Sequence, residues 1–473
     1  MKRRRFLQGL PATAALCAIG SEFTQEASAA ETPCGGRGPL VYATPGCITG
    51  PVAKMLMPPQ GEPPLPQSPH FKGLRFTGRQ RDYRDSIHAD TWYPSWAADG
   101  TLYSSYTDGT VNDAAGRTTK VSSQWRASEA WFRDIGIGAT DGQIPCIDSD
   151  RFGTSGNATL SGDDPFQLTA TPLEPFRHAS PRYEGYYPCA NFFHQGVWYY
   201  GGYYCHRWLN KRNVPITYEN GGFGGFRISR DGGKSWVDTP HDDLYPLFPE
   251  TGRCSGGAPI KMGTPHFVDF GRDLEHSPDG YAYLAGHGTY DPDGITNWCS
   301  GDAVSLARVR PSPETMNDPG AWEFFAGHDP SGKPVWSKDF SRIQPLISWP
   351  GGAGCVNITY HPTLKKYFAI LCGGWADGDS GCYNLWVVES DSLTGPWFTV
   401  ACLRGSCGGQ AYFVCMPSKF NRDDSRKLTF FYSANWSTYL PWKTIDRPGI
   451  PSAIDTSGPG GLYSLNVAEF ELL

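Results

Sequence analysis

The sequence predicts an all-β protein, and more narrowly a five-bladed β-propeller of four-stranded antiparallel blades. One unit recurs five times: an apolar strand, a polar turn, a second aromatic-rich strand and then a third strand. The 57 Gly and 40 Pro favour short strands joined by turns, and no long segment has a helical period. The chain is long for one domain, but the blades of a closed repeat array share one ring-shaped core.

Residues 1–30 have the features of an export signal. A basic start, Lys2 to Arg5, precedes an apolar stretch over 10–19, and small residues at 27–30 suit cleavage. Consecutive arginines followed by Phe6 and Leu7 are typical of the twin-arginine signal, with an ordinary secretory signal as the alternative. We therefore expect a periplasmic or secreted protein. Because no later stretch approaches the roughly 18 apolar residues of a membrane helix, we expect no membrane insertion.

Residues 31–69, Pro-rich over 58–69, predict a tether, and residues 70–473 predict a single propeller domain. The chain carries 41 Lys and Arg against 47 Asp and Glu, without a basic block, which argues against nucleic acid as a partner. We expect a monomer that binds an oligosaccharide or polysaccharide. Of the 14 cysteines, Cys17 lies in the signal, so an odd number remains in a chain expected to reach an oxidising compartment. The close pairs Cys372/Cys382 and Cys402/Cys407 are candidates for disulfides.

The five units can be followed along the printed sequence. Their hairpins are predicted at 92–106, 191–200, 266–285, 356–372 and 412–433. Their third strands are predicted at 157–160, 225–229, 303–309, 385–389 and 462–470. The fifth unit ends without an outer strand, and the segment 74–77 has no place in any unit. We therefore expect 74–77 to pair beside 463–470 and to cover both exposed edges.

The turn from Ser229 to Trp236 resembles the Asp-box of sialidase-like propellers, with Ser235 in place of Thr. The resemblance implies a structural role, in which Asp231 and the serines close the turn and Trp236 packs between blades.

Propeller topology selects the candidate site. The innermost strand of each blade begins at one face of the ring, and the loop between the second and third strands returns to that face. Carboxylates at these places could act as the acid and base of glycoside cleavage, and aromatic rings could bind sugar. The catalytic candidates are Asp90, Asp302 and Glu219. The substrate-binding candidates are Trp92, Tyr93, Asp108, His266, His287, Trp298, Trp375 and Tyr412.

Asp90 opens the first inner strand and is expected to be the ionised carboxylate, with Asp302 or Glu219 as its acid partner. Each also has a plainer interpretation, in which Asp90 caps a turn, Glu219 supports a tight loop and the histidines are buried and hydrogen-bonded. No cofactor or metal is expected. The run 291–294 has the composition of a calcium loop but lacks further ligands downstream.

The five-unit layout with an acidic residue opening the first inner strand resembles the furanosidase propellers, including glycoside hydrolase family 43. The segments 90–108, 301–309 and 412–420 are similar to an uncharacterised group of secreted bacterial proteins (DUF4185-like). These resemblances imply a glycan-active enzyme, of arabinan type, with Asp90 as general base or nucleophile. The family 43 pattern has an Asp in blade two and a Glu in blade three, whereas this chain offers Glu219 in blade two and Asp302 or Glu275 in blade three.

Three functions remain open on the sequence. The first is a glycoside hydrolase on a furanose-containing polysaccharide. The second is a non-catalytic propeller that binds glycan or protein through the same face. The third is a polysaccharide lyase, for which Lys261 and Arg207 are only a sparse version of the expected basic cluster.

Overall fold

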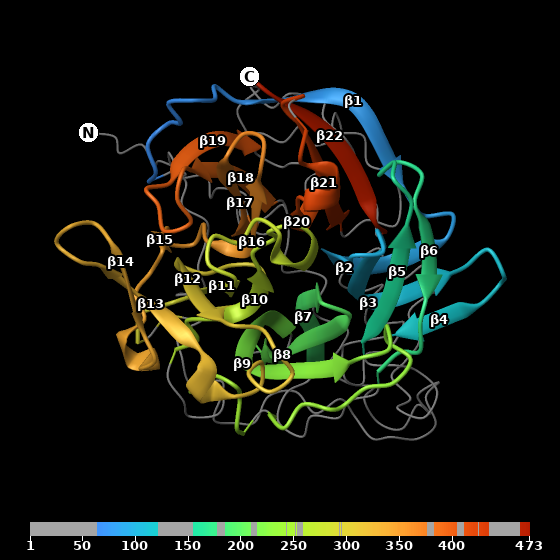
Figure 1. The fold of residues 1–473 in the computed structure, drawn as a ribbon, viewed down its shortest axis with the longest axis horizontal. Helices are drawn as coiled ribbons and strands as arrows, with labels where there is room; N and C mark the ends of the chain where they lie inside the picture. The colour runs from blue at the N-terminus through green and yellow to red at the C-terminus, as the bar shows by residue number, and fades with distance from the viewer. Residues whose placement is uncertain are drawn as a thin grey trace, which may run out of the picture.

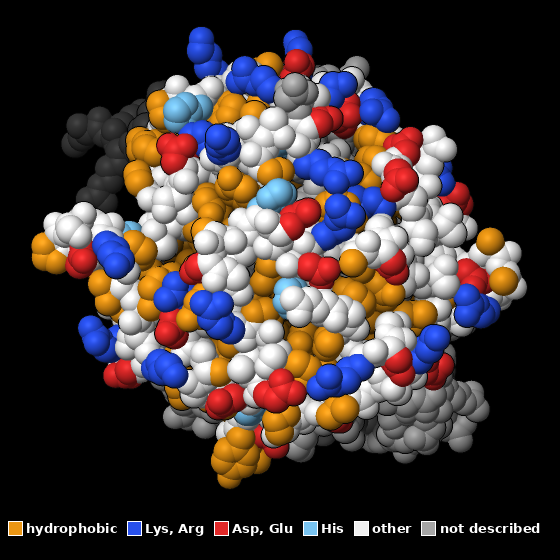
Figure 2. Space-filling view, viewed as in Figure 1, with side chains coloured by type: hydrophobic (Ala, Val, Ile, Leu, Met, Phe, Trp, Pro, Cys, Tyr) orange, Lys and Arg blue, Asp and Glu red, His pale blue; other side chains and the backbone are white. Residues whose placement is uncertain are grey.

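Five small antiparallel sheets surround a central axis in the computed structural model (Figure 1). It describes residues 64–121, 155–176, 185–209, 215–242, 244–250, 252, 259–292, 294, 296–375, 383–403, 411–423, 425–434 and 464–473. Within these residues no helix is long and apolar enough to span a membrane. Figure 2 shows acidic and basic side chains interspersed over one face of the ring rather than gathered by sign. The architecture is the predicted propeller.

Each blade begins with an inner strand and continues outward through its second and third strands. The inner strands are β2 (Ile87–Trp96), β7 (Gly185–His194), β10 (Gly263–Phe267), β16 (Gly354–His361) and β20 (Ala411–Cys415). The second strands are β3 (Leu102–Asn112), β8 (Val197–Leu209), β11 (Ala282–Gly288), β17 (Lys366–Trp375) and β21 (Lys427–Ala434). The third strands are β5 (Gly156–Ser161), β9 (Pro215–Ser229), β12 (Ala303–Val309), β18 (Tyr383–Ser390) and β22 (Asn466–Leu472). All five predicted units are therefore present.

The outer edges of the blades differ. Four blades have an outer strand: β6 (Thr169–Pro172), β13 (Glu323–His328), β19 (Phe398–Leu403) and β1 (Leu74–Asp82). Additional short strands are β4 (Thr118–Val121) beside β3, β14 (Pro334–Ser337) beside β13, and β15 (Ile347–Ser348) beside β12. The fifth predicted inner segment, 412–420, is shorter as a strand than expected. It ends at Cys415, because Pro417 has no N–H to donate, and a 3-10 turn, η9 (Ser418–Phe420), follows.

Within the described residues, the second blade has three strands where four were expected. The outer edge of β9 is instead covered by residues outside any strand. The Asn317 side-chain amide donates to the Phe226 carbonyl and accepts from the Phe226 N–H, both at 2.8 Å. Val237 exchanges two backbone hydrogen bonds with Ile228, and the Thr239 hydroxyl donates to the Gly224 carbonyl. These groups satisfy edge hydrogen bonds that a fourth strand would otherwise satisfy.

The ring closes between its first and last strands, as predicted. β1 pairs antiparallel with β22, and Leu74 faces Leu472 while Phe76 faces Phe470. The residues just before β1 lie along β19 of the fourth blade, where the Ser68 N–H donates to the Thr399 carbonyl and the Ser68 hydroxyl donates to Glu389 at 2.8 Å. We call residues 65–73 the strap. The strap and β1 together join the fourth and fifth blades (Figure 1).

The turn at 229–236 has the geometry of a structural turn. The Asp231 carboxylate accepts hydrogen bonds from the N–H and hydroxyl of Ser235, and the Ser229 hydroxyl accepts from the Gly233 N–H. The Trp236 ring packs edge-on against Phe176 at 4.8 Å and lies against Trp198 at 5.1 Å. The turn therefore anchors an aromatic side chain between the first and second blades, remote from the axis.

Candidate functional site

The five inner strands share a backbone irregularity that the sequence does not predict. Each contains one non-glycine residue in the left-handed region: Thr91 (φ 53°), Ala190 (φ 33°), Thr264 (φ 44°), Cys355 (φ 45°) and Phe413 (φ 47°). In every blade the pairing of the inner strand with the second strand shifts register at this residue. Such backbone costs about 1–3 kcal/mol per residue and is concentrated at functional sites. We call these five residues the bulge ring.

Asp90 does not open the first inner strand as expected, because β2 already begins at Ile87; it directly precedes the member of the bulge ring in the first blade. Its backbone pairs with Thr107, and the register shifts on both sides of that pair. The Thr91 N–H donates to the Ser433 hydroxyl at 3.0 Å, which links the bulge to the fifth blade. The residues equivalent to Asp90 in the other blades are Cys189, Gly263, Gly354 and Tyr412. Asp90 is therefore the carboxylate-bearing residue at this level of the ring.

Aromatic side chains meet around the axis just beyond the bulge ring. The ring of Tyr93 lies 4.3 Å from that of His266 and 5.4 Å from that of Phe413. The ring of Trp298 lies 5.1 Å from that of Tyr412 and 5.8 Å from that of Phe413. We call Tyr93, His266, Trp298, Tyr412 and Phe413 the channel plug. Four of its five members were predicted as site residues, and Trp298 is the half-buried one.

His266 and His287 are neutral, buried groups rather than exposed acids. Burial lowers the pKa of His266 to about 3, with a further contribution from nearby His287. Burial also lowers the pKa of His287 to about 4. Nε2 of His287 donates to the Asn297 carbonyl at 2.8 Å, and the Asn220 amide donates to the same carbonyl at 3.1 Å. These contacts give His287 a role in holding loops of the second and third blades together.

Among the three catalytic candidates, Asp302 is the one whose side chain the structure describes. It precedes β12, and its side chain accepts hydrogen bonds from the Thr289 hydroxyl at 2.7 Å and the Gly351 N–H at 3.0 Å. Burial raises its pKa against the effect of those two donors, and Asp291 raises it further. A half-buried carboxyl group with a raised pKa can serve as a proton donor.

Other candidates lie apart from the plug or outside the described part of the chain. Trp92 stacks on Tyr106 at 5.0 Å inside a separate core cluster. The backbones of Asp90, Asp108, Glu219 and Trp375 are placed in strands, but their side chains lie outside the described residues, as do Cys382 and Cys407. Within the described residues no group of three His, Cys, Asp or Glu side chains is arranged to hold a metal ion.

Glu250 was not singled out from the sequence. It is 1% exposed, and its carboxylate accepts hydrogen bonds from the backbone N–H groups of Lys261 and Met262, which lead into β10. Burial raises its pKa to about 7, against the effect of these two donors. Neither spacing nor a motif marks this residue, because the contact is made across a loop.

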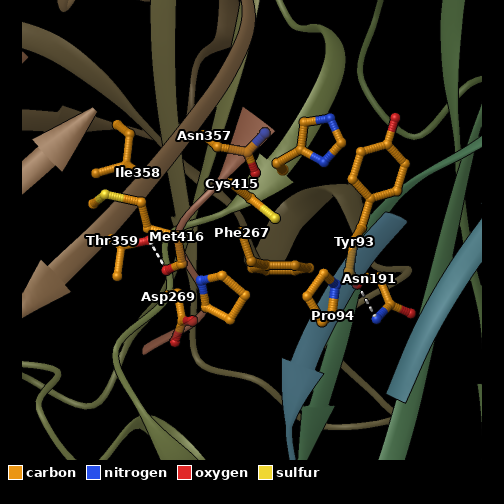
Figure 3. Close-up of a pocket in the computed structure, with 12 residues that line it drawn as sticks. Tyr93, Pro94, Asn191, Phe267, Asp269, Asn357, Ile358, Thr359, Cys415 and Met416 are labelled. Atoms are coloured by element: carbon orange, nitrogen blue, oxygen red, sulfur yellow. Dashed lines mark hydrogen bonds between the residues drawn. The ribbon is translucent and has the colours of Figure 1, made fainter. Parts of the chain in front are cut away.

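A small cavity lies on the axis beside the channel plug (Figure 3). Its volume is about 30 Å3, and residues of all five inner strands or the segments just after them line it. Tyr93 and His266 belong to both the plug and the cavity wall, so the plug closes one side of the cavity.

Comparison with known proteins gives only distant likenesses. No family model and no curated protein matches the chain. Among solved structures, the GH43_1 enzyme from Xanthomonas citri is 13% identical with a TM-score of 0.37, covering 81% of this chain and 87% of that one. The GH32 β-fructofuranosidase from Bombyx mori is 12% identical with a TM-score of 0.40, covering 89% and 65%. The GH62 α-L-arabinofuranosidase catalytic domain from Coprinopsis cinerea is 11% identical with a TM-score of 0.35, covering 88% and 94%. These likenesses assign no residue or activity to this chain.

Proposed function

We propose that the protein is an exported glycoside hydrolase that acts on a polysaccharide, of furanose type, at the bulge ring of the inner strands. The observation that carries the proposal is the position of Asp90 immediately before the bulge ring. Strained backbone persists only where the surrounding structure over-determines it, and it often holds reactive side chains in place. Asp90 is the carboxylate-bearing residue at that level, so it is the one we assign as general base or nucleophile.

The channel plug supports a sugar substrate. Small-molecule sites are lined mainly by apolar and aromatic side chains, with a few polar groups that fix orientation. Trp298 is half-buried and rests on Tyr412 and Phe413, so it offers an aromatic surface on a rigid support. A sugar ring, with apolar faces and polar edges, fits such a surface.

Two residues remain candidates for the proton donor. Asp302 has the raised pKa that a proton donor needs. It lies just before β12, the second strand along from β10, and at the usual spacing between neighbouring strands β12 is about 10 Å from β10. Glu219 adjoins Asn220, whose amide donates to the Thr264 hydroxyl at 3.1 Å, so its backbone lies near the bulge ring. Glu250 is a weaker candidate because both its carboxylate oxygens already bind the backbone before β10.

Product analysis on purified protein tests the proposal. The panel should include arabinan, arabinogalactan, levan, xylan and a uronate polymer. We expect new reducing ends without ultraviolet absorbance from a new double bond. Absorbance would indicate a lyase, and binding without cleavage on any polymer would indicate a binding module. Either outcome would overturn the assignment.

The role of Asp90 needs its own variant. Asp90→Asn should abolish most turnover on the substrate that the panel identifies, and Asp302→Asn and Glu219→Gln should show which residue donates the proton. A general acid is recognised by recovery of activity on substrates whose leaving group needs no protonation. Normal turnover of Asp90→Asn would remove the central residue of the proposal.

A further inference from the structure

Side chains hold the bulge of the first blade in addition to the strand ladder. The Thr91 N–H donates to the hydroxyl of Ser433, in β21 of the fifth blade, at 3.0 Å. Within the first blade, the Trp92 indole N–H donates back to the Ala89 carbonyl at 3.1 Å. Asp90 lies between these points, and the strand pairing shifts register on both sides of it. The backbone around Asp90 is therefore fixed by contacts that a regular strand does not make.

The contact from the fifth blade distinguishes the first blade from the others. Within the described residues, Thr91 is the member of the bulge ring whose backbone N–H is bonded to a side chain. The fifth blade also reaches the next residue, where the Cys415 thiol donates to the Trp92 carbonyl at 3.8 Å. The first blade is also the one that carries a carboxylate, Asp90, directly before its bulge. The additional hydrogen bond thus occurs where a reactive side chain would need to be held.

Ser433 is placed to hold this peptide group firmly. It is 1% exposed, and its backbone pairs with Tyr412 of β20. The Thr91 N–H belongs to the peptide group that joins Asp90 to Thr91, and a peptide group is planar. Fixing this N–H therefore fixes the plane that follows Asp90, together with the left-handed backbone of Thr91. Without the hydroxyl this buried N–H would lose its acceptor, so rotation of the peptide group towards another acceptor would be favoured.

We propose that Ser433 is a positioning residue for Asp90. Its hydroxyl holds the peptide group after Asp90, and through it the Cα–Cβ bond of Asp90, in the orientation that a general base or nucleophile needs. The kinetic part of this inference rests on the proposed function. A misplacement of about 1 Å can lower a rate by about 100-fold. Loss of the Ser433 hydroxyl should therefore lower turnover although Ser433 itself is buried away from the substrate.

Kinetics on the substrate that the polysaccharide panel identifies test this role. Ser433→Ala should lower kcat by about 10–100-fold and leave KM within about twofold of the native value, and Ser433→Thr, which keeps a hydroxyl, should recover most of the loss. The matched control is Ser229→Ala. Ser229 is also buried, and its hydroxyl accepts the Gly233 N–H at 2.8 Å, but it lies remote from the axis. The control should keep the native kcat.

Two kinetic outcomes separate this inference from the proposed function. An unchanged kcat in Ser433→Ala, with turnover abolished in Asp90→Asn, would overturn the positioning role and leave the proposed function standing. Normal turnover in Asp90→Asn would instead remove the proposed function, and the positioning role would then be decided by the structure of the variant.

A crystal structure of Ser433→Ala, compared with the native protein in the same crystal form, is the test that needs no substrate. We expect the peptide group between Asp90 and Thr91 to be rotated or to occupy two orientations. A peptide group in the native orientation, for example with a water molecule in place of the hydroxyl, would overturn the proposal. If Ser433→Ala does not fold, Ser433→Cys, whose sulfur is a weak acceptor, replaces it in both tests.

Discussion

Replacing Phe71 by Ala should measure how strongly the strap holds the ring closed. Phe71 is 5% exposed, and its ring packs against Phe368 of the fourth blade at 5.7 Å. The next residue, Lys72, donates its N–H to the Leu473 carbonyl at the end of the chain. One aromatic side chain of the strap therefore packs beside the join between the two ends of the ring.

The expected loss follows from the burial of this ring. Truncating a buried Phe to Ala costs about 3–5 kcal/mol, and we take about 3 kcal/mol because a strap at an edge can relax. The unfolding entropy is about 2.1 cal/mol/K per residue, or about 0.8 kcal/mol/K over roughly 400 residues. For cooperative unfolding, Phe71→Ala should therefore lower Tm by about 3–4 °C.

Thermal unfolding followed by circular dichroism, at several scan rates, provides the assay. His70→Ala is the matched control, because the neighbouring His70 side chain is 46% exposed and lies 3.8 Å from Asp391 in a weak surface contact. The control should change Tm by less than about 1 °C. Equal shifts for the two variants would refute the view that Phe71 anchors the strap.

Three further predictions concern charge. Asp90→Asn should lower turnover by orders of magnitude while Tm stays within about 1 °C of the native value, measured on the substrate that the panel identifies. The neutral folded forms of His266 and His287, with pKa values of about 3 and 4, remain unprotonated while the unfolded chain takes up protons below about pH 6.5. Their stabilisation is therefore present above that pH and is lost towards pH 4, by up to about 1.4 kcal/mol per pH unit per group. Urea unfolding measured across this pH range should show that the free energy of unfolding falls less steeply with decreasing pH in His287→Phe than in the native protein. Glu250, whose pKa is raised to about 7, acts in the opposite sense. Its contribution is fully present below about pH 4.5 and is lost as pH rises to about 7, so Glu250→Gln should remove that loss from the pH profile. An unchanged profile would show that folding does not shift the pKa of Glu250.

The repeats and the closure of the ring could be predicted because their signals are local. Turn residues between apolar runs mark each hairpin, and the lack of an outer strand in the last unit left 74–77 as its partner. The lack of a fourth strand among the described residues of the second blade could not be predicted in this way. Asn317 lies about 90 residues from the strand that it covers, and a single Asn carries no pattern.

The candidate site was predicted in part. Topology brings Tyr93, His266, Trp298 and Tyr412 together at the axis, as the order of strands requires. The separation of Trp92 from its neighbour Tyr93 depends on strand alternation and on the bulge at Thr91. Sequence could not reveal that bulge, because Thr, Ala, Cys and Phe rarely adopt left-handed backbone, and only the closed ring selects it here.

The join between β1 and β22 also constrains when the protein can fold. Leu74 and Leu472 are about 400 residues apart and pair directly, so the ring stays an open arc until β22 has left the ribosome. Contacts of such long sequence separation form late, because the loop-closure entropy must be overcome before they stabilise the chain. During synthesis both ends of the arc present unpaired strand edges, which are the surfaces most prone to pair with other chains. Protection of the nascent chain by chaperones should therefore matter most in the interval before its final strand emerges.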